Sequence, residues 1–174
     1  INVSDFDLIY AGAQKNMGPA GTTLVIVNKN ALGKTGRDIP SMLDYAVHAG
    51  KDSMFNTPPV FAVYTSMLTL QWLKENGGIS EIEKKNKEKA NALYREIDEN
   101  PKFEGIAQLE DRSTMNVTFR LVDENDQEQF DKLCLKNGIS GVKGHRSVGG
   151  YRASIYNALP IESVQALINT MKEL

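Results

Sequence analysis

Cysteine and long apolar runs are both scarce in this chain, and each scarcity excludes a class of protein. Cys134 is the only cysteine among the 174 residues, so the chain can form neither an internal disulfide nor a cysteine-based metal cage. No apolar run approaches the roughly 20 residues that a membrane-spanning helix needs, and no basic-then-apolar signal peptide is present. The two histidines, His48 and His145, lie far apart without metal-ligand spacing, so we predict no metal site.

An excess of charge of either sign is also missing. The chain has 20 lysines and arginines against 22 aspartates and glutamates, which leaves a formal net charge of −2. This balance predicts no nucleic-acid or membrane partner, so an anionic ligand must be bound by a local group of basic residues. Hydrophobic residues make up 41% and charged residues 24%, as in ordinary globular proteins, and together with the single thiol this favours a cytoplasmic location.

The first third of the chain has the pattern of two short strands and an irregular stretch. Ile1 opens it without an initiator methionine and a strand-like run follows almost at once, which indicates a fragment or a processed chain. Residues 6–10 and 22–27 are the expected strands, and small residues fill the loop 11–21 between them. Residues 33–53 mix glycine, proline and charge, so we expect irregular structure with at most a turn of helix.

A long apolar helix is expected next. Thr57 is suited to cap it, prolines occupy its first turn, and it should run to about Asn76 and end at Gly77-Gly78. Apolar residues cover most of its sides, and such a helix is usually buried or packed against another subunit.

The remaining chain predicts a small α+β layer. Ser80 and Glu83 form a capping-box pattern for a helix that ends before Pro101, with its lysines and glutamates on a solvated face. Asp126 and Gln129 are the expected caps of a later helix. The pattern after Pro101 is strand, strand, helix, strand, strand and helix, at about 103–109, 115–122, 126–138, 139–143, 152–156 and 161–173. The domain boundary is expected near Gly77-Gly78.

Lys15 is the first candidate for chemistry. It follows a strand and lies among small residues that allow a ligand to approach, and lysine is the residue that forms Schiff bases with aldehydes. An exposed lysine in a glycine-rich turn is the alternative, and spacing alone favours it.

Two further segments are suited to bind anions. Residues 144–152 place His145, Arg146 and Arg152 in a glycine-rich loop, and arginine grips carboxylate or phosphate with two hydrogen bonds. The segment that begins with Asn56 and Thr57 precedes a helix N-terminus, whose N–H groups attract anions. A solvated basic hairpin and simple helix capping are the respective alternatives.

Taken together, these segments resemble the phosphoserine aminotransferase family of fold-type I pyridoxal-phosphate enzymes. The ordered set is highly specific and covers the chain from end to end, although any single block is weak. The matching blocks are Asp7–Asn16, Ile39–Tyr45, Asn56–Pro59, Arg112–Val117, Gly144–Gly150 and Arg152–Ala158.

The resemblance implies pyridoxal 5′-phosphate as cofactor and a homodimer as the assembly. Lys15 would form the Schiff base with the cofactor, and Gln14 would lie against its phosphate. Asn56 and Thr57 would reach the cofactor phosphate of the other subunit. Lys15, once released by the substrate amine, would act as the catalytic acid and base.

The resemblance also implies the substrates, which are small amino and keto acids with two anionic ends. Arg152 would hold the substrate α-carboxylate, and His145 and Arg146 would meet the phosphate or the distal carboxylate of glutamate. The implied reaction transfers an amino group between L-glutamate and 3-phosphohydroxypyruvate in serine biosynthesis. Members of the family also act on 4-phosphohydroxythreonine in vitamin B6 synthesis.

The implied fold is α/β and divides at the expected boundary. Residues 1–77 would be the C-terminal portion of the cofactor-binding large domain, and residues 78–174 the small C-terminal α+β domain. The family's chains are much longer, so we expect this chain alone to be inactive. The alternatives are a catalytically incompetent module kept for folding or dimerisation, and another enzyme of the same fold. A cysteine desulfurase needs a cysteine in an exposed loop, whereas Cys134 is expected in a helix.

Overall fold

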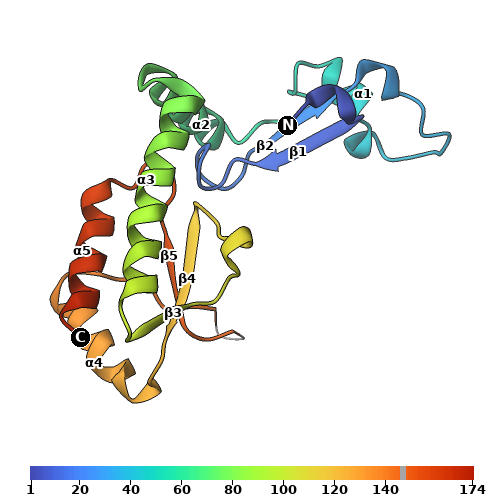
Figure 1. Cartoon of the computed structure of the whole chain (residues 1–174). Helices are drawn as coiled ribbons and strands as arrows, with labels where there is room; N and C mark the ends of the chain where they lie inside the picture. Colours follow the sequence, from blue (N-terminus) through green and yellow to red (C-terminus); the bar gives the residue numbers. More distant parts are fainter. Residues whose placement is uncertain (146–147) are drawn as a thin grey trace. The chain divides into compact units, whose positions relative to one another are not determined.

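The computed structural model of the protein describes residues 1–145 and 148–174 and shows two compact units, Ile1–Trp72 and Leu73–Leu174 (Figure 1). The division falls inside helix α2 (Val60–Glu75). The functional domain boundary near Gly77-Gly78 stays a prediction. Within the two described ranges, no helix is long and apolar enough to cross a membrane.

The first unit is built on a β-hairpin. Strands β1 (Leu8–Gly12) and β2 (Thr23–Val27) pair antiparallel, with Leu8 opposite Val27 and Gly12 opposite Thr23, and both expected strands are confirmed. The irregular stretch also holds a single turn of α-helix, as expected. The remaining elements are η1 (Val3–Asp5), η2 (Lys29–Ala31), η3 (Ser41–Leu43), α1 (Tyr45–Ala49) and the start of α2.

Helix α2 exposes most of its apolar side chains. Among the described residues of the first unit, the only buried hydrophobic side chains are Ala13 and Ala62. A two-stranded hairpin offers too little surface to cover a helix that is apolar on most sides. The expectation of a buried helix is therefore wrong for the chain by itself, and packing against another subunit stays a prediction. The exposed residues are Val60, Phe61, Val63, Tyr64, Met67, Leu68, Leu70 and Trp72.

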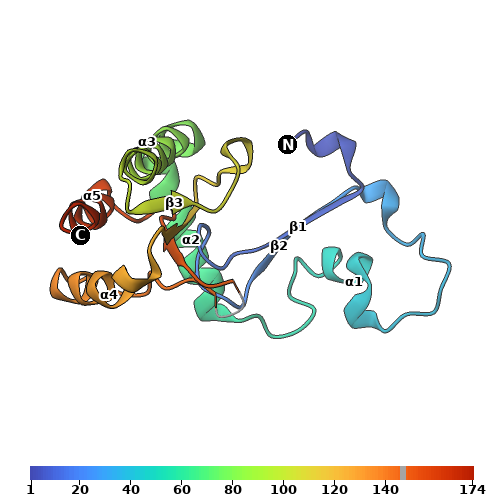
Figure 2. The same cartoon turned by 60° about the horizontal axis from the view of Figure 1, so that its bottom comes forward.

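The second unit is a layer of helices on one face of an antiparallel sheet (Figures 1 and 2). The strand order is β3-β4-β5, so β4 is central. This arrangement confirms the predicted α+β layer. The elements are α3 (Gly78–Glu99), β3 (Phe103–Gly105), η4 (Leu109–Asp111), β4 (Asn116–Leu121), η5 (Glu124–Asp126), α4 (Gln127–Lys136), β5 (Tyr151–Ser154) and α5 (Ile161–Lys172).

Alternation along the strands builds the core of this unit. Val117, Phe119 and Leu121 on β4 are buried while the residues between them are not, because successive side chains point to opposite faces. Phe119 stacks on Tyr151 with ring centroids 5.4 Å apart, and Phe130 of α4 meets the Tyr151 ring edge-on at 5.0 Å. The second unit is thus the better-formed part of the chain, as expected.

Both expected capping boxes are wrong. Helix α3 begins at Gly78, because Gly77 adopts a positive φ of 94° that starts the helix earlier, and Ser80 therefore lies inside the helix. Glu83 instead pairs with Lys87 at 2.6 Å. Asp126 precedes α4, but no side-chain cap hydrogen bond forms there.

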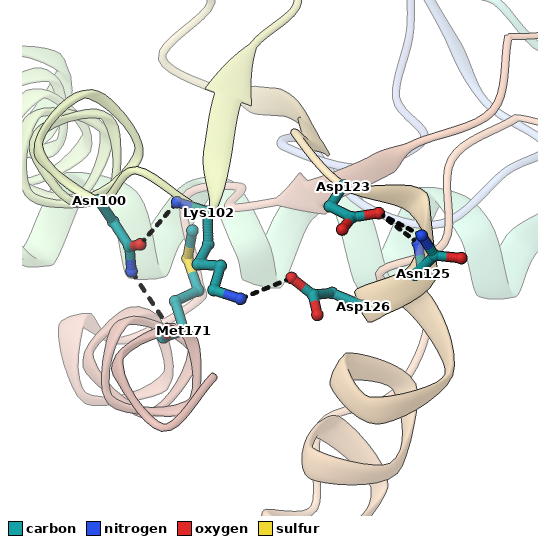
Figure 3. A network of polar contacts seen from close by, with 6 residues as sticks. All are labelled: Asn100, Lys102, Asp123, Asn125, Asp126 and Met171. Carbon is teal, nitrogen blue, oxygen red and sulfur yellow. Dashed lines mark hydrogen bonds and ion pairs between the residues drawn. The ribbon is translucent and has the colours of Figure 1, made fainter.

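The carboxylate of Asp126 belongs to a polar network that joins three elements (Figure 3). It accepts from Lys102 Nζ at 2.8 Å, and the backbone N–H of Lys102 donates to Asn100 Oδ1 at 3.1 Å. Asn100 Nδ2 also donates to the Met171 carbonyl at 3.3 Å, so the ends of α3 and α5 are tied to the start of β3. Asp123 accepts from the backbone and side chain of Asn125 beside them.

One expected strand is absent and another is shorter. In the described part of residues 139–143, only Lys143 forms an isolated bridge, to Tyr151, and Val142 accepts one backbone hydrogen bond from Arg152. The strand expected at 103–109 ends at Gly105. The guanidinium of Arg112 lies over Gly105 at that end, where a Cβ atom would come within 3.0 Å of it.

Candidate active site

Lys15 lies in a tight loop between β1 and β2. Its backbone N–H donates to the Gly18 carbonyl at 2.9 Å, and the Met17 N–H donates to the Ala13 carbonyl at 3.2 Å. Lys15 has a φ of 93°, which non-glycine residues rarely adopt, while its side chain is exposed. Backbone strain of this kind persists where the surrounding structure enforces it, and it concentrates at functional sites.

The loop rests on α2 through residues that lack bulk. A Cβ atom built on Gly18 would lie 2.5 Å from Ser66 Oγ and 3.1 Å from Ser66 Cα. A Cβ atom on Gly21 would lie 3.5 Å from Ala62 Cβ. Ala62 and Ser66 are the buried residues of α2 and lie one turn apart on the helix. The contact therefore fixes the distance between the loop and the helix.

Asn56 and Thr57 lie just before the same helix, and both are exposed. Asn56 Nδ2 donates to the Thr57 carbonyl at 3.1 Å. The first turn of α2 is closed by the Val63 N–H, which donates to the Pro59 carbonyl at 3.1 Å. Pro59 rather than Thr57 is therefore the capping residue, and the expected cap at Thr57 is wrong.

Arg152 lies on β5 and extends from the face of the sheet that the helices do not cover. Its strand neighbours Tyr151 and Ala153 are buried, whereas Arg152 is exposed. The Arg152 N–H donates to the Val142 carbonyl at 2.7 Å, on the side away from β4. Arg152 and Thr118 are thus a pair without backbone hydrogen bonds between them, and the side chains of such pairs approach closely.

His145 lies in the loop that leads back to β5. Its carbonyl accepts from the N–H groups of Val148 and Gly149, both at 2.9 Å. A Cβ atom on Gly144 would collide with the Gly149 carbonyl oxygen, so only glycine fits where the two arms of this hairpin meet. Arg146 lies outside the described residues. The four cofactor candidates belong to the first unit, and His145 and Arg152 belong to the second.

Sequence reasoning missed two groups near Arg152. On the open face of the sheet, Asn116 Oδ1 accepts from Ser154 Oγ at 3.1 Å, and Asn116 Nδ2 donates to Tyr156 Oη at 3.3 Å. The alternation of polar residues along β4 is the signal that could have indicated this cluster. On the other face, Lys89 is buried, although the lysines of α3 were expected in solvent. Its helical spacing is the signal, because Lys89 lies seven residues after Ile82 and four before Leu93, on the buried face of α3.

Cys134 cannot act as a ready nucleophile in this fold. It is buried in α4, and burial, followed by the nearby charge of Asp131, raises the pKa of its thiol to about 11. A thiol with this pKa is almost entirely protonated near neutral pH. Among the residues that the structure describes, no cluster of three or more histidine, cysteine and acidic side chains could hold a metal ion.

Comparison with known proteins places this geometry among aminotransferases. The aminotransferase class-V family model matches residues 1–167. The phosphoserine aminotransferase of Flavobacterium psychrophilum is 68% identical over 174 residues, which are 100% of this chain and 49% of that protein. The solved phosphoserine aminotransferase from Bacillus circulans subsp. alkalophilus has a TM-score of 0.93 at 42% identity, over 99% of this chain and 48% of that one.

A further solved structure, of phosphoserine aminotransferase with bound pyridoxal phosphate from Trichomonas vaginalis, has a TM-score of 0.90 at 38% identity. It covers 99% of this chain and 49% of that one. The chain spans about half the length of the curated relatives it matches. It has the fold of the matching half of these enzymes.

Proposed function

The chain belongs to the class-V aminotransferase family, and from that premise we propose that it is the lysine-bearing half of a pyridoxal-phosphate-dependent phosphoserine aminotransferase. The observation that carries the proposal is Lys15, held exposed at a φ of 93° on a loop seated against α2. Asp52 and Ser53 also have positive φ, and what sets Lys15 apart is its place on a loop packed against α2. Strained backbone conformations concentrate at functional sites. The 68% identity to a named phosphoserine aminotransferase supports this substrate class.

The residues present in the first unit fit the cofactor. Lys15 offers an amine for the aldehyde, and Gln14, Asn56 and Thr57 offer neutral donors for the phosphate. The loop around Lys15 carries small residues, so a flat ring can approach the amine closely. When bound, pyridoxal phosphate supplies the electron sink that makes the substrate Cα–H acidic. Asn56 and Thr57 are assigned to the cofactor of a second subunit, so the proposal includes a homodimer.

The second unit supplies the substrate-binding cations. Arg152 presents a planar fork that matches the α-carboxylate of the amino acid. His145 and Arg146 bind the distal anion, which is a phosphate in one substrate and a carboxylate in the other. A pair of dianionic substrates explains why two separate cationic groups are needed in a chain whose overall charge is close to zero.

The reaction moves one amino group between two carbon skeletons. Glutamate becomes 2-oxoglutarate, and 3-phosphohydroxypyruvate becomes phosphoserine. The ε-amine of Lys15 would take the proton from the substrate Cα as general base and would return it, as general acid, at the carbon that had been the cofactor aldehyde. Serine biosynthesis in the cytoplasm is the proposed setting, and 4-phosphohydroxythreonine in vitamin B6 synthesis is a second substrate of the same shape and charge.

The chain alone is proposed to be inactive. Its hairpin has two strands, and the apolar side chains of α2 are exposed, so the large domain lacks the surface that would cover them. A non-catalytic module kept for folding or dimerisation is the alternative. The exposed Lys15 and Arg152 favour an enzyme over that alternative, because a module with no site gains nothing from a strained lysine.

The test uses a chimera in which this chain replaces the matching half of the Flavobacterium psychrophilum relative. With pyridoxal phosphate added, we expect a visible absorption band, its loss on addition of glutamate, and borohydride trapping of the cofactor on Lys15. Lys15→Ala should abolish all three signals. Lys51→Ala, which removes another exposed lysine of the same unit, should leave them unchanged.

Two outcomes would contradict the proposal. A chimera that folds but shows no Lys15-dependent band rejects the assignment of the cofactor lysine. Full turnover of glutamate and 3-phosphohydroxypyruvate by the 174-residue chain alone rejects the claim that it carries only part of the active site.

A further inference from the structure

Ser66 of α2 is a small residue at the base of the Lys15 loop, and its position has a consequence for Lys15. Its hydroxyl oxygen is buried, and no hydrogen-bond partner is found for it among the described residues. Only 8% of the residue is exposed. Burial of a hydroxyl without a partner carries a cost that alanine would avoid, so the requirement at this position is for small size rather than for a hydrogen bond.

Gly18 is the residue that Ser66 touches, and it tolerates no side chain. Its φ of 150° is unfavourable for any other residue, and a Cβ atom would meet both the side chain and the backbone of Ser66. Gly18 therefore lies directly on the helix. The Gly18 carbonyl accepts the hydrogen bond from the Lys15 N–H at 2.9 Å. Gly18 also forms an isolated β-bridge with Gln14.

These contacts connect helix α2 to Lys15 through Gly18. Ser66 determines how closely Gly18 approaches α2. The Gly18 carbonyl in turn accepts the hydrogen bond that holds the Lys15 backbone at its φ of 93°. One turn earlier, Ala62 supports Gly21 in the same way at 3.5 Å. Cores are close-packed, so an added methyl group at such a contact displaces the neighbouring backbone.

We propose that Ser66 is a positioning residue for Lys15, acting through Gly18. The proposal rests on the proposed function, in which Lys15 is the cofactor lysine. It also gives α2 a second role, because the segment Asn56–Thr57 leads directly into the same helix. The helix then links Lys15, which serves the cofactor of its own subunit, to Asn56 and Thr57, which serve the cofactor of the second subunit.

The experiment measures how fast the cofactor is trapped on Lys15 in the chimera. Borohydride is added at set times after mixing with pyridoxal phosphate, and the labelled Lys15 peptide is quantified by mass spectrometry. Ser66→Ala leaves the contact with Gly18 uncrowded, so the cofactor should be trapped on Lys15 at the wild-type rate. Ser66→Val adds bulk beneath Gly18 and should slow trapping by about a hundredfold, the scale expected when a reacting group is misplaced by an ångström.

A matched control distinguishes the effect of valine on helix stability from the effect of its bulk on the contact with Gly18. Ser80→Val makes the same change at an exposed position of α3 and should trap at the wild-type rate. Thermal unfolding of each variant is recorded, and trapping is measured below the unfolding transition. The pH dependence of the absorption band is a second readout, since displacement of Lys15 changes the surroundings of its amine.

A double variant tests whether the effect passes through Gly18. Gly18→Ala and Ser66→Val disturb one contact, so the double variant should trap little more slowly than the worse single variant. The inference is overturned if folded Ser66→Val traps as fast as the wild type, or if Ser80→Val is equally slow. If the two changes multiply fully, Ser66 does not act through Gly18. Absence of trapping in the wild-type chimera would instead reject the proposed function.

Discussion

The buried ammonium group of Lys89 donates a hydrogen bond to the backbone carbonyl of Tyr156 at 2.7 Å. It also donates to the carbonyls of Ile155 at 3.1 Å and Leu159 at 3.0 Å. All three donors of the lysine are thus used by one segment, which connects β5 to α5. The lysine crosses from α3 to hold the chain just after the strand that carries Arg152.

Replacement of Lys89 should destabilise the second unit more than replacement of any exposed lysine. Lys89→Met keeps the aliphatic stem but leaves three buried carbonyls without their donor, and we expect a loss of about 3 kcal/mol in the free energy of unfolding. Urea denaturation followed by circular dichroism measures it. Lys85→Met on the exposed face of α3 is the control and should change stability by less than about 0.5 kcal/mol. Equal effects of the two variants would contradict the role of the buried hydrogen bonds.

The ion pair between Arg112 and Asp98 should make stability depend on pH in the acid range. Arg112 binds both carboxylate oxygens, at 2.7 and 2.6 Å, and hydrogen bonding to Arg112 lowers the pKa of Asp98 below its usual value of 3.8. Because the folded pKa lies below the unfolded one, the stabilisation is full above pH 3.8 and is lost as the pH falls through the folded pKa.

Asp98→Asn should therefore cost about 1 kcal/mol at pH 7, since the carboxylate is partly exposed and screened. The difference from the wild type should shrink as the pH falls below 3.8 and should vanish once Asp98 is protonated in the folded protein. Unfolding curves of both proteins from pH 7 into the acid range provide the measurement. A difference that persists undiminished in acid would show that the charge on Asp98 is not its source.

Gly144 should be irreplaceable in the hairpin that carries His145 and Arg152. Gly144→Ala would drive a methyl group into the Gly149 carbonyl, and we expect this overpacking to cost about 2 kcal/mol and to open the hairpin. Hydrogen exchange of the Arg152 amide, which donates to Val142, should then accelerate. Gly141→Ala is the control, because a Cβ atom there meets nothing within 4 Å, so any cost of that change comes from its positive φ of 73°. Similar acceleration in both variants would show that the collision at Gly144 is not the cause.

Cys134 should resist alkylation while the chain is folded. Burial raises the pKa of its thiol from 9.0 to about 11, which lowers the thiolate population by about a hundredfold at pH 8. Labelling with iodoacetamide at pH 8 should be at least that much slower in the native protein than in urea. Rapid labelling of the native protein would mean that α4 opens readily, and it would revive an exposed-cysteine mechanism.

Short-range patterns predicted most of the second unit. Alternation along β4 predicted its buried face, and the spacing of Val164, Leu167, Ile168 and Met171 accounts for the buried face of α5. The capping boxes were wrong for a physical reason. Gly77 adopts a positive φ that starts α3 before Ser80, and residue type alone does not predict that φ. The Asp126 carboxylate binds Lys102, which lies 24 residues away and outside any local capping pattern.

The order of the family's sequence blocks predicted Lys15, Gln14, Asn56, Thr57, His145, Arg146 and Arg152 as site residues, and these roles stay predictions. The structure adds the contacts between distant residues that hold the segments carrying these residues. The seat of Gly18 on Ser66 joins residues 48 positions apart in sequence, and the bonds from Lys89 to the segment after β5 span more than 60.

The sequence by itself determined the family, the candidate chemistry and the periodic elements, because these depend on residue identity and on spacing within a few turns. Only the tertiary structure decided which lysine is buried, which serine lies against the Lys15 loop and which apolar helix is left uncovered. Burial is a property of the surfaces that meet in space. Residue type alone does not predict the burial of Lys89 or Ser66, which follows from what the fold places against them.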